Sequence, residues 1–435
     1  MSKDKNRFGE AAGQPVEAII VGAGHRGLLY ASYSEQHPEQ LRIVGVVDPD
    51  PSRRKKTAER FGFSSDRCWA SVGELTALER MADVAINGTM DQLHVETTLP
   101  LLHAGYDVLL EKPIGVSEAE VLQLQQTAKA LNRKVVIGHV LRYAPFYAAI
   151  RQRIEDGEVG EIVSLQTTEN VSYHHMATAF VRGKWNSLEN CQSTLLMAKC
   201  CHDLDLIVWM KSGVHPVKAA SFGSLMQFRP EKAPAGAGTR CLVDCPLEAE
   251  CTYSARKMYV DPGLQGAYAW DFTNLSPQSS EAEKLESLRT DNPYGRCVWR
   301  CDNDVVDHQT VIVEFEDGST ATHNLVGATS RPCRSIHIIG TRGEIQGVME
   351  EGRFVIRHPD YSAMDGYSEE WVELDVSADM HGGGDMRLVA DFLNVLRGGE
   401  HSLSSTSLDQ SILSHQIGFA ADRSRLENRV INIEV

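Results

Sequence analysis

The feature that most constrains the fold is a glycine-rich turn that closes the first apolar segment of the chain. Residues 17–21 are Glu-Ala-Ile-Ile-Val, and they run directly into Gly22-Ala23-Gly24-His25-Arg26-Gly27. A strand that ends on G-x-G-x-x-G and opens a helix is typical of a dinucleotide-binding unit. Gly22 would make the tight turn, Gly24 would let the backbone approach a pyrophosphate, and Gly27 would let the helix pack on the strand. His25 and Arg26 would begin that helix, whose free N–H groups favour a phosphate.

A second apolar strand, residues 41–47, supports this interpretation because it ends on an acid. Asp48 follows the last glycine by about 20 residues, where a carboxylate can accept the ribose hydroxyls. This position favours NAD. The alternative is that Asp48 is only a turn residue, since prolines follow closely. Arg53 and Arg54 lie close enough to tolerate a 2′-phosphate, so NADP is the less favoured cofactor.

Length and charge narrow the class of protein. A chain of 435 residues predicts two domains rather than one. Its 59 acidic and 43 basic residues give a net charge of −16, which argues against a nucleic-acid or anionic-membrane partner. The apolar runs fall short of the roughly 18 residues that a membrane span needs. We therefore expect a cytoplasmic protein with a disordered tail over residues 1–14.

Alternating strands and helices continue after Asp48. We expect helices over 52–61 and 117–131 and strands over 82–88, 106–110 and 134–138. Strands that alternate with helices predict a parallel, doubly wound sheet. The sequence thus predicts an α/β protein with an N-terminal Rossmann domain over 15–145 and a second domain over 146–435.

Four motifs, in this order and spacing, resemble the Gfo/Idh/MocA oxidoreductases, the family of glucose-fructose oxidoreductase and inositol dehydrogenase. They are the glycine turn, the segment from Thr89 to His94, Glu111-Lys112-Pro113, and Arg142-Tyr143-Ala144-Pro145. The resemblance implies that the second domain is α+β, with a large, mostly antiparallel open sheet and helices on one face. It also implies a homodimer or homotetramer formed through the other face. Segments 161–167, 309–315 and 335–340, helix 390–396 and strand 429–435 fit that domain.

The same resemblance gives roles to the E-K-P motif. Lys112 would lie between nicotinamide and substrate, and Glu111 would contact the nicotinamide ribose. Further contacts implied by the motifs are Thr89, His94 and Arg142 for the cofactor and Tyr143 for the substrate. A partly desolvated ammonium beside a cationic nicotinamide has a lowered pKa and can orient or deprotonate a carbinol hydroxyl. The alternative for Lys112 is a solvated lysine after a strand.

A histidine farther along resembles the catalytic acid/base of the family. His202 stands where members carry a G-G-H-x-x-D-like motif, and imidazole is the side chain nearest neutrality in pKa. Asp205, or Asp203, would fix its tautomer. The alternative is a satisfied helix-cap histidine. The glycine-rich loop from His381 to Asp385 resembles the rim of the family's active site, or is only a flexible turn.

One departure from the family bears on the substrate. Many polyol dehydrogenases of this family carry an Asp four residues before the histidine, whereas this chain has Ala198 followed by Lys199. The local cations are His174, His175, Arg182, Lys184 and Lys199. Because arginine offers a bidentate fork to anions, we expect a sugar that bears a carboxylate or sulfonate. The alternative is a solvated basic face.

Five cysteines form a separate cluster in the sequence. They are Cys241, Cys245, Cys251, Cys297 and Cys301, and the first three lie in a loop-like insert over 233–258. Thiolates gathered from two loops suit a structural zinc ion, which could hold an insert that has little core of its own. The spacing is not that of a C-x-x-C ribbon, so free thiols are the alternative.

Three functions remain open at this point. The first is an NAD-dependent enzyme that takes hydride from a sugar carbinol, with Lys112 and His202 handling the proton. The second is an NAD-dependent glycoside hydrolase that oxidises C3, eliminates the aglycone, adds water and returns the hydride, with Lys199 as an additional base. The third is a regulator that uses the fold as an NAD sensor.

Overall fold

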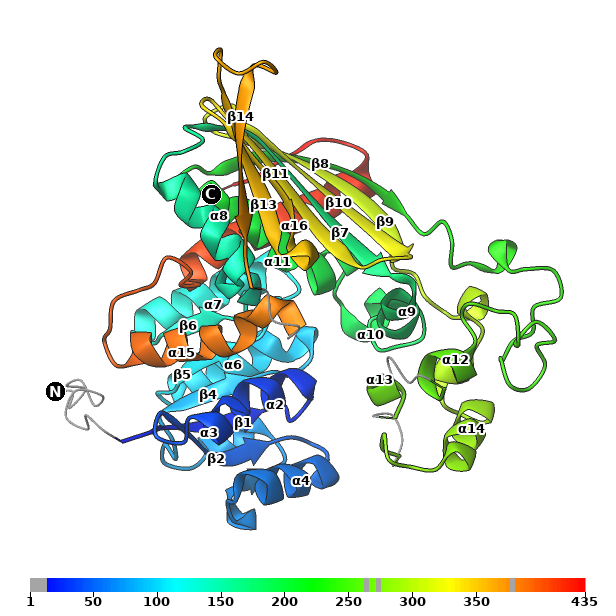
Figure 1. Cartoon of the computed structure of the whole chain (residues 1–435). Coiled ribbons are helices and arrows are strands. Elements are labelled where there is room, and N and C mark those ends of the chain that lie inside the picture. The colour runs from blue at the N-terminus through cyan, green and yellow to red at the C-terminus, as the bar shows by residue number, and fades with distance from the viewer. Residues whose placement is uncertain (1–13, 262–265, 271–274, 376–379, 435) are drawn as a thin grey trace.

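The computed structural model describes residues 14–261, 266–270, 275–375 and 380–434. Of the expected tail over 1–14, all but the last residue lies outside the described residues. The N-terminal domain is a Rossmann fold around a six-stranded parallel sheet in the order β3-β2-β1-β4-β5-β6 (Figure 1). Its strands are β1 (Val16–Val21), β2 (Leu41–Val47), β3 (Cys68–Trp69), β4 (Val84–Asn87), β5 (Asp107–Leu110) and β6 (Val135–Ile137). Its helices are α2 (His25–Ala31), α3 (Tyr33–Gln36), α4 (Pro51–Phe61), α5 (Val72–Thr76), α6 (His94–His103) and α7 (Glu118–Leu131).

The second domain is built on a nine-stranded sheet in the order β14-β13-β12-β11-β7-β10-β9-β8-β15. Its strands are β7 (Ile162–Ser172), β8 (Pro216–Ser224), β9 (His308–Phe315), β10 (Thr320–Thr329), β11 (Cys333–Gly340), β12 (Glu344–Val348), β13 (Arg353–Pro359), β14 (Tyr367–Glu373) and β15 (Ile431–Asn432). All of the pairings are antiparallel except that between β7 and β10. The predicted fold class, a Rossmann domain followed by an α+β domain with a mostly antiparallel sheet, is confirmed.

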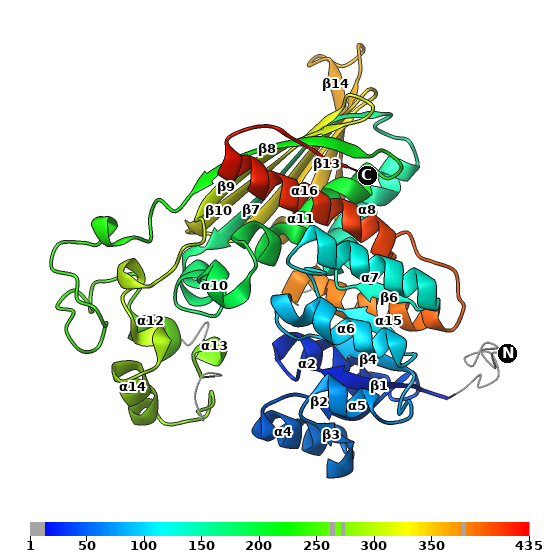
Figure 2. The ribbon, with the colours of Figure 1, turned by 180° about the vertical axis from the view of Figure 1, so that it is seen from behind.

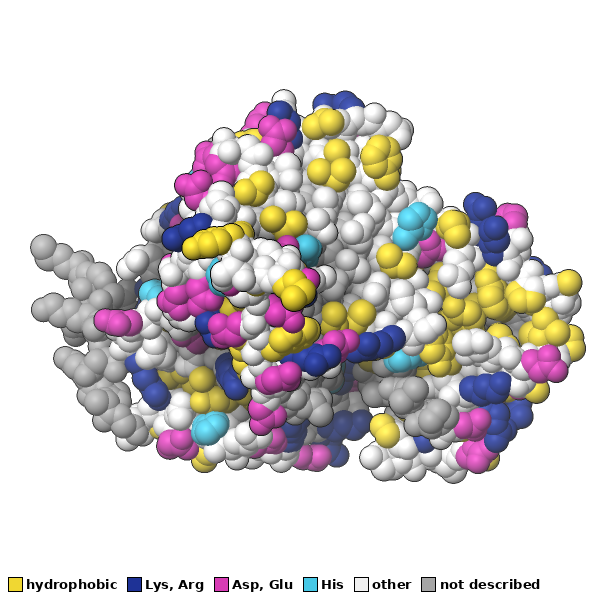
Figure 3. Space-filling model, turned by 45° about the horizontal axis from the view of Figure 1, so that its top comes forward, with side chains coloured by type: hydrophobic (Ala, Val, Ile, Leu, Met, Phe, Trp, Pro, Cys, Tyr) yellow, Lys and Arg dark blue, Asp and Glu magenta, His cyan; other side chains and the backbone are white. Residues whose placement is uncertain are grey.

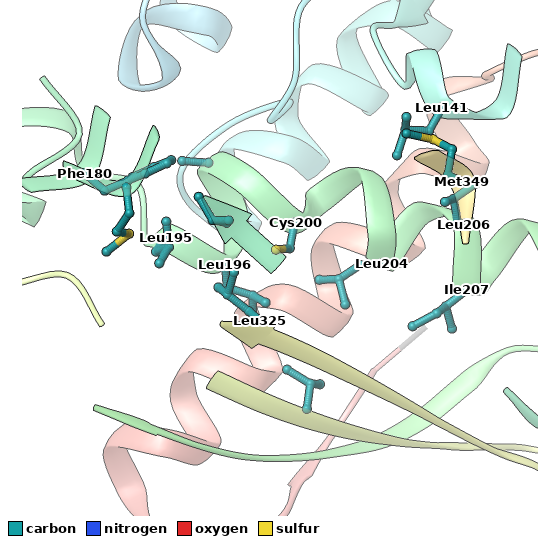
Figure 4. Packing of buried hydrophobic residues seen from close by; sticks show 14 of the residues in the cluster. Leu141, Phe180, Leu195, Leu196, Cys200, Leu204, Leu206, Ile207, Leu325 and Met349 are labelled. Atoms are coloured by element: carbon teal, nitrogen blue, oxygen red, sulfur yellow. The ribbon is translucent and has the colours of Figure 1, made fainter. Parts of the chain in front are cut away.

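Helices cover only one face of this sheet. They are α8 (Pro145–Glu155), α9 (Tyr173–His175), α10 (Leu188–Cys191), α11 (Leu195–Met210) and α16 (Leu408–Glu427). Figure 2 shows α11 and α16 lying across the covered face, while the other face points toward the viewer in Figure 1. Leu196, Leu204 and Ile207 of α11 belong to the same buried cluster as Leu325 of β10 (Figure 4). Almost every residue of α11 is buried, because the sheet lies on one side and the Rossmann domain on the other.

One helix from the segment predicted as the second domain packs on the first domain. The segment assigned to helix 390–396 of the second domain is the longer helix α15 (Gly384–Leu396). Leu388, Val389 and Phe392 of α15 pack against the apolar residues of β1 and β2, so this helix covers the Rossmann sheet. The two domains therefore share a core, because the chain returns to the first domain after it has built most of the second.

An insert of about 80 residues separates β8 from β9. It contains α12 (Ala255–Tyr259), α13 (Gly266–Trp270) and α14 (Glu281–Arg289), and the rest is turns and loops. Figures 1 and 2 show α12, α13 and α14 below one end of the sheet, at the height of the Rossmann helices α2 and α4 and to one side of them. None of the helices described is both long and apolar enough to cross a membrane.

Candidate active site

The glycine turn has the geometry that a dinucleotide requires. Gly22 has a φ of +84°, and a Cβ there would come within 2.8 Å of the carbonyl oxygen of Gly88. A Cβ on Gly27 would meet the carbonyl oxygen of Gly22, so both positions need glycine. A Cβ on Gly24, by contrast, would meet nothing within 4 Å. The space in front of Gly24 and of the exposed His25 therefore fits a pyrophosphate.

Asp48 lies beside this turn. Its carboxylate accepts hydrogen bonds from the backbone N–H groups of Ala23 and Asp50, each at 2.8 Å. Two acceptor sites of the carboxylate remain for ribose hydroxyls, because an ionised carboxylate has about four. Arg54 donates to the carbonyl oxygens of Asp48 and Pro49, and Arg53 lies 3.9 Å from the carboxylate of Asp50. Both arginines are thus engaged locally.

The E-K-P turn follows β5 and carries a buried ion network. Glu111 pairs with Arg26, and its second oxygen accepts the N–H of Lys112 at 2.7 Å. Arg26 also donates to Tyr30 at 2.5 Å and to Asp385 at 2.7 Å. Burial by itself would raise the pKa of Glu111, but Arg26 and Lys112 lower it below its usual range. Arg26, predicted as a cofactor ligand, is therefore the cation that holds the Glu111 carboxylate in place.

Two histidines fix the same turn from opposite sides. His94, at the start of α6, donates from Nδ1 to the carbonyl oxygen of Pro113 at 2.5 Å. His415 of α16 accepts the N–H of Ile114 at Nε2, 2.8 Å away. The predicted role of His94 was contact with the cofactor. In the structure both of its ring nitrogens lie at backbone carbonyl oxygens, those of Pro113 and Thr89. Sequence reasoning missed His415, which lies some 300 residues from the turn that it supports.

The anchored turn brings Lys112 to α11. Its Nζ donates to the carbonyl oxygen of Ala198 at 2.6 Å, one helical turn before His202. Thr89, on the neighbouring turn after β4, donates to the side chain of Asn87 at 2.9 Å. This bond brings Lys112 to the helix that carries His202, and the charge of Lys112 contributes to the lowered pKa of His202.

His202 is almost fully buried, and neither of its ring nitrogens has a hydrogen-bond partner among the described residues. Burial lowers its pKa well below the usual range, and the charge of Lys112 lowers it further. The ring is therefore neutral at pH 7 and can accept a proton. Its centroid lies 5.5 Å from that of His381 and 5.9 Å from that of His139.

The carboxylate expected to orient His202 lies elsewhere. Asp205 binds Arg142 through two hydrogen bonds of 2.6 Å, and Asp203 accepts from Arg334 at 3.2 Å. The neighbouring His381 has a carboxylate partner, since its Nδ1 lies 3.1 Å from Asp385. The predicted orienting role of Asp205 and Asp203 is wrong because both are used by buried arginines.

Arg142 and Tyr143 also differ from their predicted roles. Arg142 is fully buried and joins the end of the Rossmann domain to α11 through Asp205. The hydroxyl of Tyr143 donates to Asp391 of α15 at 2.8 Å. Arg142 therefore joins the two domains, and Tyr143 attaches the end of the Rossmann domain to α15. Their predicted contacts with cofactor and substrate stay predictions.

A second group of charges lies beside Lys199. Its Nζ is 3.2 Å from the carboxylate of Glu169 on β7, and Arg334 of β11 is 2.7 Å from the other oxygen of Glu169. Lys199, Glu169 and Arg334 line a cavity of about 200 Å³ together with His174 and His175. Burial raises the pKa of Asp203, whereas Arg334 and Lys199 lower that of Glu169 despite its burial. Glu169 is thus the ionised partner of both cations.

Sequence reasoning missed Glu169 and Arg334. Both occupy positions that face the helices, where their strand neighbours Leu165 and Ile336 are apolar. A charged residue at an inward-facing position of a strand indicates a functional or paired site. That position can be recognised only once the strand register is known.

The predicted cationic cluster does not form. Arg182 lines a different cavity, in the insert, where it donates to the backbone carbonyls of Arg296 at 2.7 Å and Tyr253 at 2.8 Å. Lys184 is exposed and lies over the ring of Trp185. Only Lys199 and the two histidines share one cavity, and Glu169 balances the lysine. The argument for an anionic sugar loses its main support.

The predicted zinc site is not supported either. Cys241, Cys245, Cys251 and Cys297 line one cavity, but no three of their sulfur atoms lie within 4.8 Å of one another in the described part of the chain. A tetrahedral zinc ion with Zn–S bonds of about 2.3 Å would hold its sulfur ligands roughly 3.8 Å apart. The sulfur atoms are too widely spaced for one ion. Cys301 does not line the cavity, and its thiol donates to the carbonyl oxygen of Cys297 at 3.3 Å.

Comparison with known families agrees with this geometry. Residues 16–139 match the model described as oxidoreductase family, NAD-binding Rossmann fold. Residues 151–433 match the C-terminal alpha/beta domain of the same oxidoreductase family. The chain belongs to the GFO_IDH_MocA oxidoreductase family. The predicted family is confirmed.

Relatives within the GFO_IDH_MocA family are distant. A putative oxidoreductase of Bacillus subtilis, YteT, is 24% identical over 374 residues, which is 82% of this chain and 83% of that protein. Inositol 2-dehydrogenase of Corynebacterium glutamicum strain R is also 24% identical, but the match covers 44% of this chain and 52% of the relative.

Solved structures share the fold. Levoglucosan dehydrogenase in complex with NADH superposes with a TM-score of 0.70 at 15% identity, covering 97% of this chain and all of that one. The WlbA dehydrogenase of Chromobacterium violaceum, in complex with NADH and UDP-GlcNAcA, gives a TM-score of 0.64 at 16% identity, covering 97% of each chain.

Proposed function

We propose that this protein is an NAD-dependent dehydrogenase that takes hydride from a carbinol of a sugar or related polyol. The observation that carries this proposal is the meeting of Lys112 and His202 beside the glycine turn. Lys112 donates a hydrogen bond to the carbonyl oxygen of Ala198 on α11. His202 is buried, and neither of its ring nitrogens is hydrogen-bonded to a described residue. A dinucleotide-binding regulator has no need of such a pair.

The two side chains divide the work on the substrate hydroxyl. The ammonium of Lys112, held by the Ala198 carbonyl, donates to the hydroxyl oxygen and stabilises developing negative charge there. Neutral His202 accepts the hydroxyl proton at a ring nitrogen, because its lowered pKa keeps that nitrogen unprotonated. The nicotinamide, when bound, accepts the hydride. Proton and hydride leave the same carbinol, so the product is a carbonyl.

NAD is the favoured cofactor. Asp48 at the end of β2 presents a carboxylate where ribose hydroxyls would lie, and a 2′-phosphate would meet its negative charge. Arg53 and Arg54 offset this only weakly, because both are engaged with the carboxylate of Asp50 or with backbone carbonyls. The protein should therefore bind NADH in preference to NADPH.

The substrate is proposed to be a neutral sugar or polyol. Lys199, Glu169 and Arg334 present hydrogen-bond donors and an acceptor side by side, which suits hydroxyl groups. Glu169 offers from β7 a carboxylate in place of the Asp that many family members carry at the position of Ala198. The glycosidase alternative needs Lys199 as an additional base, and the ion pair with Glu169 disfavours that role.

We also propose that a second copy of the chain covers the open face of the sheet. Phe222, Ile312 and Val326 project from that face with exposed fractions of 72%, 45% and 39%. Figure 3 shows hydrophobic side chains on this face among polar ones. Apolar side chains within a broad sheet surface are typical of an interface between subunits.

The proposal is tested by incubating the protein with NAD⁺ or NADP⁺ and a panel of neutral sugars, uronates and their glycosides. NADH formation and aglycone release are followed together. We expect stoichiometric NADH with a neutral sugar or polyol, no aglycone release, and loss of about 100-fold or more in kcat for Lys112→Ala. Lys56→Ala, an exposed lysine of α4, is the control and should match wild type.

Other outcomes point to the other functions. Aglycone release without net NADH, abolished in Lys112→Ala, would make the protein a redox-neutral glycosidase. Tight NADH binding with no turnover of any compound, unchanged in Lys112→Ala, would favour the sensor. A clear preference for uronates would restore the anionic-substrate hypothesis.

A further inference from the structure

Three cysteines that are close in sequence and a fourth from a later segment line one cavity of the insert. Cys241, Cys245, Cys251 and Cys297 line a cavity of about 360 Å³, together with apolar residues such as Leu247 and Trp299. In Figure 3 hydrophobic side chains gather over this part of the molecule. The cavity lies in the insert between β8 and β9 and shares no lining residue with the cavity beside Lys199. The two cavities are therefore distinct.

The arrangement fits a cluster better than a single ion. A mononuclear zinc ion would require sulfur atoms within about 3.8 Å of one another. No three of these sulfur atoms lie within 4.8 Å, judged over the residues that the structure describes. In a four-iron cluster each thiolate binds a different iron at a corner of the cube, so the sulfur ligands stand farther apart around a larger volume.

A buried arginine gives independent support. Arg182 is 2% exposed, and no carboxylate pairs with it among the described residues; its contacts are backbone carbonyls, the Tyr259 hydroxyl and sulfur atoms. Its Nη2 lies 3.5 Å from Sγ of Cys241. Burying an unpaired cation is costly. Four thiolates around a cluster carry net negative charge, which would supply the missing partner.

Backbone geometry adds a further contact of the same kind. The N–H of Tyr253 donates to Sγ of Cys251 at 3.3 Å. Hydrogen bonds to the sulfur ligands, like charge and burial, stabilise iron–sulfur clusters and set their potentials. The helices α12, α13 and α14 of the insert are short and loops make up the remainder, so a cluster would join segments that have little regular structure.

We propose that Cys241, Cys245, Cys251 and Cys297 ligate a four-iron iron–sulfur cluster that holds the insert together, with Arg182 as its buried counter-charge. Cys301 is not a ligand. The cluster has no step in hydride transfer, so its presence is independent of the dehydrogenase proposal.

The test is metal and sulfide analysis of the full chain purified without oxygen and reconstituted with iron and sulfide. We expect about four iron and four acid-labile sulfide per chain, with brown visible absorption that bleaches on reduction. Cys245→Ser should lose most of the iron and absorption. Cys301→Ser, and Cys68→Ser on β3 in the other domain, should keep them.

Three results would overturn the proposal. One zinc per chain with no iron would make the site mononuclear. A chain that takes up no metal yet binds NADH normally would leave four free thiols. Equal iron content in Cys245→Ser and Cys68→Ser would place the iron elsewhere.

If Cys245→Ser is insoluble, Arg182→Met serves instead, and we expect it to lose the cluster faster than wild type on exposure to air.

Discussion

At the scale of single residues, burial decides what each ionisable group can do. His202, Asp205 and Asp203 lie within four positions on one helix, yet each has a different partner. Asp205 and Asp203 balance arginines from the Rossmann domain and from β11. His202 has no hydrogen-bond partner in the described part of the chain and stays neutral. The sequence could indicate that His202 was chemically suited to catalysis. It could not show that the neighbouring acids were already used.

The lowered pKa of His202 predicts the pH dependence of turnover. A base must be unprotonated, so activity falls only when the pH drops through its pKa in the folded protein. Because burial and Lys112 lower that pKa, we expect the acid limb of kcat to lie well below the ordinary histidine value of about 6.5. The measurement is kcat against pH with a saturating substrate.

The matched variants are His202→Gln and His401→Gln. We expect His202→Gln to lose roughly 100- to 10,000-fold in kcat with little change in NADH affinity. His401 is exposed, and its variant should keep the wild-type profile. An acid limb near pH 6.5 in wild type, or an active His202→Gln, would contradict the role of this residue.

At the scale of elements, the catalytic turn depends on helices that are remote in sequence. The turn after β5 carries Lys112 and is held by His94 of α6 and His415 of α16. His415 is fully buried with both nitrogens bonded, since Nδ1 also contacts the carbonyl oxygen of Ser411 at 2.8 Å. Burial lowers the pKa of His415 to about 3. Protonation would remove the acceptor of the Ile114 N–H.

This shift predicts how stability changes with pH. The unfolded chain protonates His415 near pH 6.5 and the folded chain only near pH 3, so the unfolded state binds more protons in between. The free energy of unfolding therefore rises with pH over that window, by about 1.4 kcal/mol per pH unit for this group. Its contribution is fully present above pH 6.5 and is lost as the pH falls.

Denaturant unfolding at pH 5, 6 and 7 measures this slope. We expect His415→Gln to be less stable than wild type at pH 7, because the bond to Ile114 is weakened, and to show a shallower dependence on pH. The exposed His401→Gln should keep the wild-type slope. Identical slopes in the wild type and His415→Gln would mean that this histidine does not titrate as its burial implies.

At the scale of the whole molecule, the face of the nine-stranded sheet that helices do not cover is a broad surface with exposed apolar side chains. Alternation along β9 and β10 directs one set of residues to the helices and leaves the other exposed. Ile312 and Phe222 stand on that exposed set in neighbouring strands. We predict that Ile312→Lys converts a dimer or tetramer to monomers, because a buried charge without a partner opposes association.

Light scattering during size-exclusion chromatography measures the mass of the assembly. Leu78→Lys is the control, since Leu78 is 47% exposed on the Rossmann domain and should tolerate the change. A monomeric wild type, or an Ile312→Lys variant of unchanged mass, would show that the face is not an interface between copies.

Local patterns were enough to predict the Rossmann half of the fold and part of the site. The glycine turn and Asp48 are recognisable because strand ends, turns and helix starts each have their own residue preferences over short distances. Lys112 and His202 were indicated by the resemblance to the family. The predicted strands and helices of the first domain agree with the structure to within a few residues. The physical reason is that a parallel strand–helix unit is specified by contiguous sequence.

Tertiary structure alone decided which charges meet. Glu169, Arg334 and His415 come from strands and a helix far along the chain, and only the register and packing of those elements bring them to Lys199 and the catalytic turn. The return of α15 to the Rossmann sheet is of the same kind. The sequence by itself determined the cofactor fold and, through the family resemblance, indicated Lys112 and His202 as the candidate catalytic pair. The partners of each charge, and hence the character of the substrate cavity, followed from long-range packing that no local pattern encodes.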